Sequence, residues 1–229
     1  MGPAGGFHEG IKFFNEQRNV DQVWLMDDDF FPATTCLEEL IKKSDDSKVL
    51  FPFMRDKAFK QNRSPGWWGV LIPQSIIATV GYPLKDLFFW VEDTEYLQHR
   101  IQDVHQYQLM YVSSAKGVHF AERIKNYRAA WRYYYEIRNM IFSRLYVRKT
   151  SRSRLHKIRR SWVRIFGGIL LKEKNKPKKI YYFLRGTIHG LRGRIGKTVD
   201  PKKRFYFKSK KMPTEGTKPI VPKRFPDLM

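Results

Sequence analysis

VWLMDDD, residues 23–29, is the stretch that decides the fold class of this chain. Its first four residues form a compact apolar run, typical of a strand buried on both faces of an α/β sheet, and the run ends abruptly in three aspartates. Ligands of open α/β sheets bind at the carboxyl ends of the strands. The segment therefore predicts an α/β fold with an acidic loop at a ligand-binding edge.

Further apolar runs lie on both sides of this segment. Residues 7–14 have helical spacing and follow Gly5 and Gly6, which predicts a glycine-rich loop that opens a short helix. Downstream, short apolar runs alternate with turns and predict the following elements: a helix over 37–41 capped by Thr34 or Thr35, a strand over 48–53, loops and short strands over 64–84, a helix through 96–101 and a strand over 109–112.

The pattern changes to longer helices beyond residue 123. Tyr127, Trp131, Tyr134 and Arg138 recur at helical spacing, and the helix that they predict is expected to pack across the sheet. Residues 162–171 mix apolar side chains with arginine and have lysine and arginine around them, which predicts a basic amphipathic segment. We therefore expect three parts: an α/β domain over 1–146, a basic helical region over 147–196, and a basic tail over 197–229 that is disordered or lies along the surface.

Charge divides the chain into two halves. The 229 residues carry 44 Lys and Arg against 22 Asp and Glu, a formal net charge of +22. Residues 1–120 hold 12 basic and 16 acidic side chains, whereas residues 121–229 hold 32 and 6. The C-terminal half is therefore expected to meet a polyanion such as nucleic acid or an anionic lipid surface.

The cysteine content and the apolar stretches bear on the compartment. A single cysteine, Cys36, excludes an intrachain disulfide scaffold and favours a reducing cytosol. The first residues have no charged segment followed by an apolar one, so no signal peptide is predicted. Residues 64–84 form the longest uncharged stretch, but its prolines argue against a membrane span. The sequence predicts a cytoplasmic protein whose membrane association is peripheral.

The aspartate triplet is the sharpest candidate for chemistry. In an extended segment Asp27 and Asp29 point to one side and Asp28 to the other. Asp27 and Asp29 could then share a hard divalent cation that bridges a diphosphate. The alternative is a solvated acidic turn without a ligand.

A second carboxylate group follows the aromatic run at residues 88–90. Glu92 and Asp93 lie at the end of this apolar element, and a carboxylate beside an apolar wall has a raised proton affinity and can act as a general base. The alternative is a helix N-terminus, where acidic residues are favoured by the helix dipole. Glu95 fits this structural alternative better.

Three weaker candidates complete the set. His119, after the strand at 109–112, could add a neutral imidazole to a metal site. Gly5 and Gly6 could offer backbone N–H groups to a phosphate. Trp67 and Trp68 could form an aromatic platform for a sugar ring, although tryptophan more often packs in a core.

Taken in order, these segments resemble the family-2 glycosyltransferases, and most closely their galactofuranosyltransferase and rhamnosyltransferase branch. The likeness covers roughly the first 145 residues and depends on the ordered combination: AGGFHEG at 4–10, VWLMDDDFFP at 23–32, WWG at 67–69, FFWVEDTEY at 88–96, His119, and YYYEIRN at 133–139. The resemblance implies a GT-A fold, a Rossmann-like α/β sheet that binds a nucleotide-sugar and a Mn or Mg ion. It also implies inverting transfer of the sugar to an acceptor hydroxyl.

The resemblance implies a role for each candidate residue. Asp93 would be the catalytic base. The donor would be bound by Gly5, Gly6, Asp27, Asp28 and Asp29, the metal by Asp27, Asp29 and His119, and the acceptor by Trp67, Trp68 and Glu92. The donor would be a UDP- or dTDP-sugar, and the acceptor a glycan or a polyprenyl-lipid-linked glycan.

One departure from the family concerns the start of the chain. Family members have a nucleoside-binding strand and helix before the AGGF motif, whereas the printed sequence begins near that motif. The expectation is therefore an N-terminally truncated GT-A sheet. The missing unit could reflect an internal start, a gene fragment or a partner that supplies it, and a non-catalytic remnant is one alternative function.

The basic C-terminal half fits enzymes that extend lipid-linked glycans at the inner face of the membrane, because lysine and arginine near an anionic surface each contribute about 1 kcal/mol. The alternative is a nucleic-acid-binding protein, motivated by the net charge of +22. The acidic N-terminal half argues against that alternative, so we expect an anionic membrane surface and no nucleic acid as partner.

Overall fold

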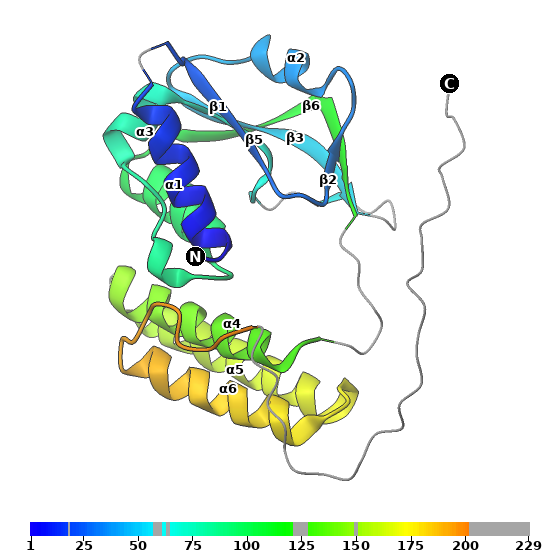
Figure 1. Ribbon diagram of the computed structural model, residues 1–229, viewed down its shortest axis with the longest axis vertical. Helices are drawn as coiled ribbons and strands as arrows, with labels where there is room; N and C mark the ends of the chain where they lie inside the picture. The colour runs from blue at the N-terminus through cyan, green and yellow to red at the C-terminus, as the bar shows by residue number, and fades with distance from the viewer. Residues whose placement is uncertain (18, 57–60, 63–64, 121–127, 149–150, 202–229) are drawn as a thin grey trace, which may run out of the picture.

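A mixed β-sheet and a C-terminal layer of helices make up the molecule (Figure 1). The computed structural model describes residues 1–17, 19–56, 61–62, 65–120, 128–148 and 151–201. This architecture confirms the α/β class and the helical C-terminal region predicted from the sequence. Among the residues it describes, no helix is both long and apolar enough to cross a membrane.

The sheet curls until its two edges almost meet. Its strands are β1 (Gln22–Met26), β2 (Phe30–Pro32), β3 (Lys48–Asp56), β4 (Gln61–Asn62), β5 (Trp68–Pro73) and β6 (Gln108–His119). Five strands follow the order β1-β5-β3-β6-β2, and β4 pairs with β3. β3 and β6 are parallel, whereas β1 with β5, β3 with β5 and β2 with β6 are antiparallel. The edge strands β1 and β2 are joined by residues 27–29 alone, and the sheet is nearly closed into a barrel.

Alternating side chains of the central strands fill two cores, one on each face of the sheet. On β3, Val49 and Phe51 pack on one face with Ile11, Ile77 and other residues of the helices there. Leu50 points to the opposite face and packs with Leu40. The helices around the sheet are α1 (Pro3–Asn15), α2 (Cys36–Ile41), α3 (Gln74–Val80), the 3₁₀ turn η1 (Lys85–Leu87) and the π-helix η2 (Thr94–Val104).

The predicted strand at 23–26 exists, but its position differs from the prediction. β1 lies at one end of the strand order and pairs antiparallel with β5. Val23 is its buried residue, and the others are only partly buried. The prediction of a strand buried on both faces was wrong because an apolar run does not show whether a strand is central or at an edge.

The structure confirms some of the other predicted elements and contradicts others. α2 follows Thr35 as predicted, and β3, β6 and η2 lie where strands and a helix were expected. The expected short strand or loop at 74–80 is the helix α3. Gly5 and Gly6 lie inside α1 and not in a loop, since the helix already begins at Pro3.

Three helices form the C-terminal layer: α4 (Ala130–Phe142) with its π-helical extension η3 (Ser143–Val147), α5 (Arg152–Lys172) and α6 (Lys176–Leu191). α4 and α6 pack very closely, because a Cβ atom added at Gly186 would lie 2.5 Å from the carbonyl oxygen of Tyr134. The prediction that α4 packs across the sheet was therefore wrong, and Tyr127 of the predicted helix lies outside the described residues. The partners of α4 are α6, α5 and the loop at 86–91.

The start of the predicted tail contacts this layer. Tyr135 donates a hydrogen bond through Oη to the carbonyl of Val199 at 2.6 Å, and Val199 is buried. Thr198 and Val199 therefore contact α4, and the rest of the predicted tail beyond residue 201 lies outside the described residues.

Candidate functional site

Three segments that are far apart in the sequence meet at one end of the sheet. The turn at 27–29 joins β1 to β2, His119 ends β6, and Glu92 and Asp93 precede η2. The N–H of Phe120 donates to the carbonyl of Asp29 at 2.8 Å and fixes the turn against the end of β6. The negative charge of Asp93 raises the pKa of Asp27, and that of Asp27 raises the pKa of Glu92, so the two acidic segments lie close together in space. Tertiary structure thus gathers most of the predicted site residues.

The aspartate triplet forms a tight turn, not the extended segment that the sequence suggested. Asp28 is exposed, whereas Asp27 and Asp29 are partly buried. Oδ1 of Asp29 lies 3.0 Å from Nε2 of His119, and the ring of Trp68 lies 5.5 Å from the imidazole, centroid to centroid. Two of the predicted metal ligands therefore contact each other directly.

Asp27 lies in an environment that disfavours its charge. Its pKa is raised to about 7, first by burial and then by the negative charges of Asp29, Asp93 and Asp28. Among the described residues, no cation lowers the pKa of Asp27 toward its ordinary value of 3.8. Such a crowded set of carboxylates is suited to a positively charged ligand.

Glu92 is buried and Asp93 is half-buried beside this turn. Burial and then the charge of Asp93 raise the pKa of Glu92 to about 8, although backbone N–H groups act in the opposite direction. Glu92 is 6% exposed, and its Oε2 has no hydrogen-bond partner within the described residues. Burial also raises the pKa of Asp93. Asp93 also caps η2, because its Oδ1 accepts from the N–H of Thr94 at 2.6 Å. The two predictions for this carboxylate, a general base and a residue of a helix N-terminus, are therefore compatible.

The loop before Glu92 has a strained backbone. Phe88, Trp90 and Val91 have φ values of 65°, 75° and 79°. Side chains with a Cβ rarely adopt positive φ, and a β-branched residue such as valine does so least readily. Strain of this kind costs about 1–3 kcal/mol per residue and persists only where surrounding contacts enforce it.

Asn139 of α4 supplies these contacts. Its Nδ2 lies 2.8 Å from each of three loop carbonyls, those of Leu87, Phe89 and Trp90. Asn139 is fully buried, so its loss would remove a buried donor from the carbonyls of Phe89 and Trp90, whereas the carbonyl of Leu87 also accepts from the N–H of Phe89 at 2.7 Å. The helical layer thereby fixes the segment that carries Glu92 and Asp93.

Arg138 extends the same network. Its Nη2 donates to the carbonyl of Leu87 at 2.9 Å, its Nη1 to the carbonyl of Gly196 at 2.6 Å, and its Nε to Oδ1 of Asn139 at 2.8 Å. The guanidinium also stacks on the ring of Tyr135 at 4.7 Å. The sequence pattern placed Arg138 at the helical spacing of Trp131 and Tyr134 but did not predict these contacts. The signal was present, since two adjacent polar residues interrupt the buried face of α4.

The remaining predicted residues are Trp67, Gly5 and Gly6, and of these the carbonyl of Trp67 accepts from the N–H of Asp27 at 2.6 Å. Trp67 is 2% exposed and stacks on Phe7 at 4.3 Å, so its ring belongs to the core and not to an acceptor platform. The side chain of Met1 packs against Gly5, whereas Gly6 is exposed. Through the N–H of Ala4, α1 reaches the strained loop at the carbonyl of Phe88, 3.4 Å away.

The donor types at the turn fit Mn or Mg. Carboxylate oxygens suit both ions, and imidazole suits transition metals. The described residues contain no group of three or more His, Cys, Asp or Glu side chains already gathered around a metal position. Mg commonly binds through one or two carboxylates together with substrate phosphates and water. Of the three predicted ligands, the structure brings Asp29 and His119 into direct contact, and Asp27 lies close enough to Asp29 to be affected by its charge.

We expect Glu92 to make stability depend on pH. Its folded pKa of about 8 exceeds the ordinary 4.5, so the stabilisation is fully present below pH 4.5 and is lost as the pH rises through 8. The free energy of unfolding should fall by about 2–4 kcal/mol over that window relative to Glu92→Gln. Urea denaturation at several pH values measures this difference. Glu38→Gln, at an exposed position on α2, is the control, and a difference that stays constant with pH would contradict the prediction.

No protein-family model matches this chain, and no curated protein matches it closely enough to identify a relative.

Proposed function

We propose that this protein is a metal-dependent inverting glycosyltransferase with a GT-A-type sheet. The observation that carries the proposal is the convergence of Asp27, Asp29, Glu92, Asp93 and His119 from three distant segments on one end of the sheet. The ordered motifs that resemble family-2 glycosyltransferases support the same reading.

Asp93 has the properties of a general base in this proposal. Burial raises its pKa, which increases its affinity for the proton of an acceptor hydroxyl. The hydroxyl oxygen forms a bond to the anomeric carbon while the bond from that carbon to the diphosphate oxygen breaks, and the electron pair leaves with the nucleoside diphosphate. Hydrogen bonds from Asn139 hold the strained loop that immediately precedes this carboxylate.

Other residues of this chain would orient the two substrates. Asp27, Asp29 and His119 would bind Mn or Mg, which when bound supplies positive charge for the departing diphosphate. Trp68 is partly exposed beside His119, so its ring could contact the acceptor sugar. Glu92 has an unpartnered buried oxygen next to Asp93 and could receive a ligand hydroxyl.

The substrates that we propose follow the resemblance. The donor is a UDP- or dTDP-linked sugar of the galactofuranose or rhamnose type, and the acceptor is a glycan or a lipid-linked glycan.

Donor binding tests this proposal most directly. The full chain should bind UDP or dTDP in calorimetric titrations only when Mn is present, because the carboxylates alone repel a diphosphate. Asp27→Ala combined with Asp29→Ala should abolish that binding. Asp45→Ala combined with Asp46→Ala removes two exposed aspartates elsewhere and should leave it unchanged. A folded parent chain that binds neither nucleotide would contradict a self-sufficient transferase and leave the non-catalytic remnant.

A further inference from the structure

The helices α5 and α6 form a hairpin with an extreme charge imbalance. α5 carries seven Lys and Arg and α6 carries four, and neither helix contains Asp or Glu. Glu173, between the helices, is already paired with Lys179 at 2.6 Å. The hairpin therefore offers a concentrated positive surface to a partner outside the described chain.

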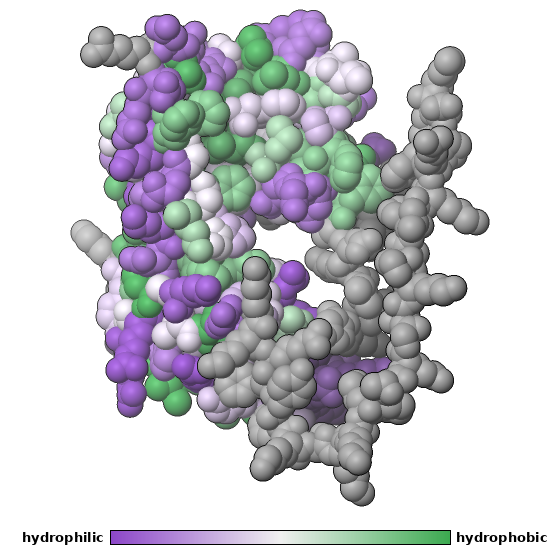
Figure 2. Space-filling model, in the orientation of Figure 1, coloured by the Kyte–Doolittle hydropathy of each residue, from purple (hydrophilic) through white to green (hydrophobic). Residues whose placement is uncertain are grey.

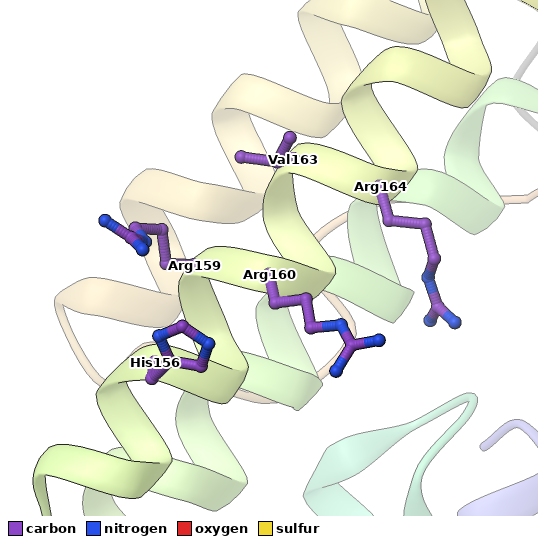
Figure 3. A pocket seen from close by; sticks show the side chains of 5 residues that line it. All are labelled: His156, Arg159, Arg160, Val163 and Arg164. Carbon is purple, nitrogen blue, oxygen red and sulfur yellow. The ribbon is translucent and has the colours of Figure 1, made fainter.

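The charge gathers on the outer side of α5, around an open hollow of about 480 Å³. Figure 3 shows the residues that line it, with Arg160 and Arg164 extending to the same side of the helix. They are His156, Arg159, Arg160, Val163 and Arg164, and all five are exposed. Within the described part of the chain, none of the three arginines pairs with a carboxylate, so their charges are available to an anion.

Exposed apolar side chains accompany this charge on both helices. On α5 they are Leu155, Val163, Leu170 and Leu171, and on α6 they are Tyr181, Leu184, Ile188 and Leu191, with exposed fractions between 41% and 82%. The four on α6 recur at i, i+3, i+7 and i+10 and form one stripe. Three of them line a second shallow hollow together with Arg185 and His189.

The buried faces of α5 and α6 already pack against other helices of the layer. Trp162 and Phe166 of α5 pack on Phe183 of α6 inside the core of the helical layer. In Figure 1, α4 lies on the side of this layer that faces the sheet. The exposed apolar residues are thus a separate surface, not an extension of this core, and water covers them in the isolated chain.

We propose that this surface, formed by the outer faces of α5 and α6, docks on an anionic phospholipid bilayer. Phosphate groups of the lipids would lie among Arg159, Arg160 and Arg164, and the aliphatic side chains would enter the boundary between headgroups and acyl chains. The exposed apolar residues of α5 and α6 favour a lipid surface over nucleic acid as the partner. Single-stranded nucleic acid is bound through aromatic platforms, whereas the exposed apolar residues of the hairpin are aliphatic except for Tyr181. The docking does not depend on whether the carboxylate site transfers sugar.

Vesicle sedimentation with the full chain tests this surface. The protein should bind vesicles of phosphatidylcholine mixed with phosphatidylglycerol and bind phosphatidylcholine alone far more weakly. Replacing Arg159, Arg160 and Arg164 by glutamine should lower the partition coefficient about 100-fold, from the usual contribution of basic residues at anionic surfaces. Val163→Ser combined with Leu170→Ser should lower it about tenfold, mainly at high salt, where the apolar contribution remains.

A matched charge control keeps the test specific. Lys12, Lys43 and Arg55 are exposed outside the hairpin, and replacing all three by glutamine removes the same charge. This control should bind nearly as the parent does. Equal losses in the two triple variants, or no binding of the parent to anionic vesicles, would overturn the proposal. So would binding to an RNA oligonucleotide that exceeds vesicle binding and falls with the same three arginines.

Discussion

An Asp93→Asn variant is expected to transfer sugar about 100- to 10,000-fold more slowly than the parent chain. Asparagine has nearly the same shape but no basic oxygen, so it cannot take the proton of the acceptor hydroxyl. Its carbonyl oxygen can still accept the bond from the N–H of Thr94, and η2 should keep its cap. Initial transfer rates with a nucleotide-sugar donor measure the loss, and calorimetry should find nucleotide affinity unchanged.

Asp103→Asn is the matched control for this prediction. Asp103 is exposed near the C-terminal end of η2, the helix that Asp93 caps, and is not among the charges that raise the pKa of Asp27 or Glu92. Its replacement should leave the rate close to that of the parent. If Asp93→Asn keeps the parent's rate, Asp93 is not the base, and Glu92 becomes the carboxylate to test next.

The second large effect is expected at Asn139. Asn139→Ala removes a buried donor from the carbonyls of Phe89 and Trp90 beside strained residues, while the carbonyl of Leu87 keeps its bond from Arg138. We expect the free energy of unfolding to fall by about 3 kcal/mol. The loop at 88–91 should also become open to chymotrypsin, which cleaves after aromatic residues. Urea denaturation measures the first effect, and mass spectrometry of the fragments measures the second.

Asn15→Ala provides a matched asparagine replacement outside the loop. Asn15 is partly buried and donates through Nδ2 to the Tyr82 hydroxyl at 3.1 Å. Its loss should cost about 1 kcal/mol and should not expose residues 88–91 to cleavage. Equal protease resistance of the parent and Asn139→Ala would show that the loop holds its conformation without the Asn139 side chain.

Local patterns in the sequence were enough for several elements and failed for others. The run at 23–26 predicted a strand because apolar residues followed directly by three aspartates leave few alternatives. The run at 75–80 was equally apolar, but a run this short suits a strand or a helix, and it became α3. Whether β1 is central or at an edge depends on its partners, which lie about fifty residues away.

The candidate site divides in the same way. Carboxylates at 27–29 and 92–93 were identified because acidic residues directly after apolar runs are unusual. Trp67 and Trp68 could not be separated, since neighbouring residues at the start of a strand point in opposite directions and only the packing shows which one is buried. The contacts of Asn139 with the loop carbonyls could not be predicted, because every residue has a backbone carbonyl and the sequence does not show which of them a side chain will contact.

By itself, the sequence determined the kinds of groups available to this protein: an apolar strand with an acidic loop, a pair of carboxylates after an aromatic run, and a basic amphipathic segment. These properties are local, and hydrophobicity and charge encode them within a few neighbouring positions. Only the tertiary structure decided that Asp27 and Asp93 share one electrostatic environment and that α4 holds the strained loop. Both depend on contacts between residues about fifty or more positions apart, and such contacts form only when the sheet curls and the helical layer packs.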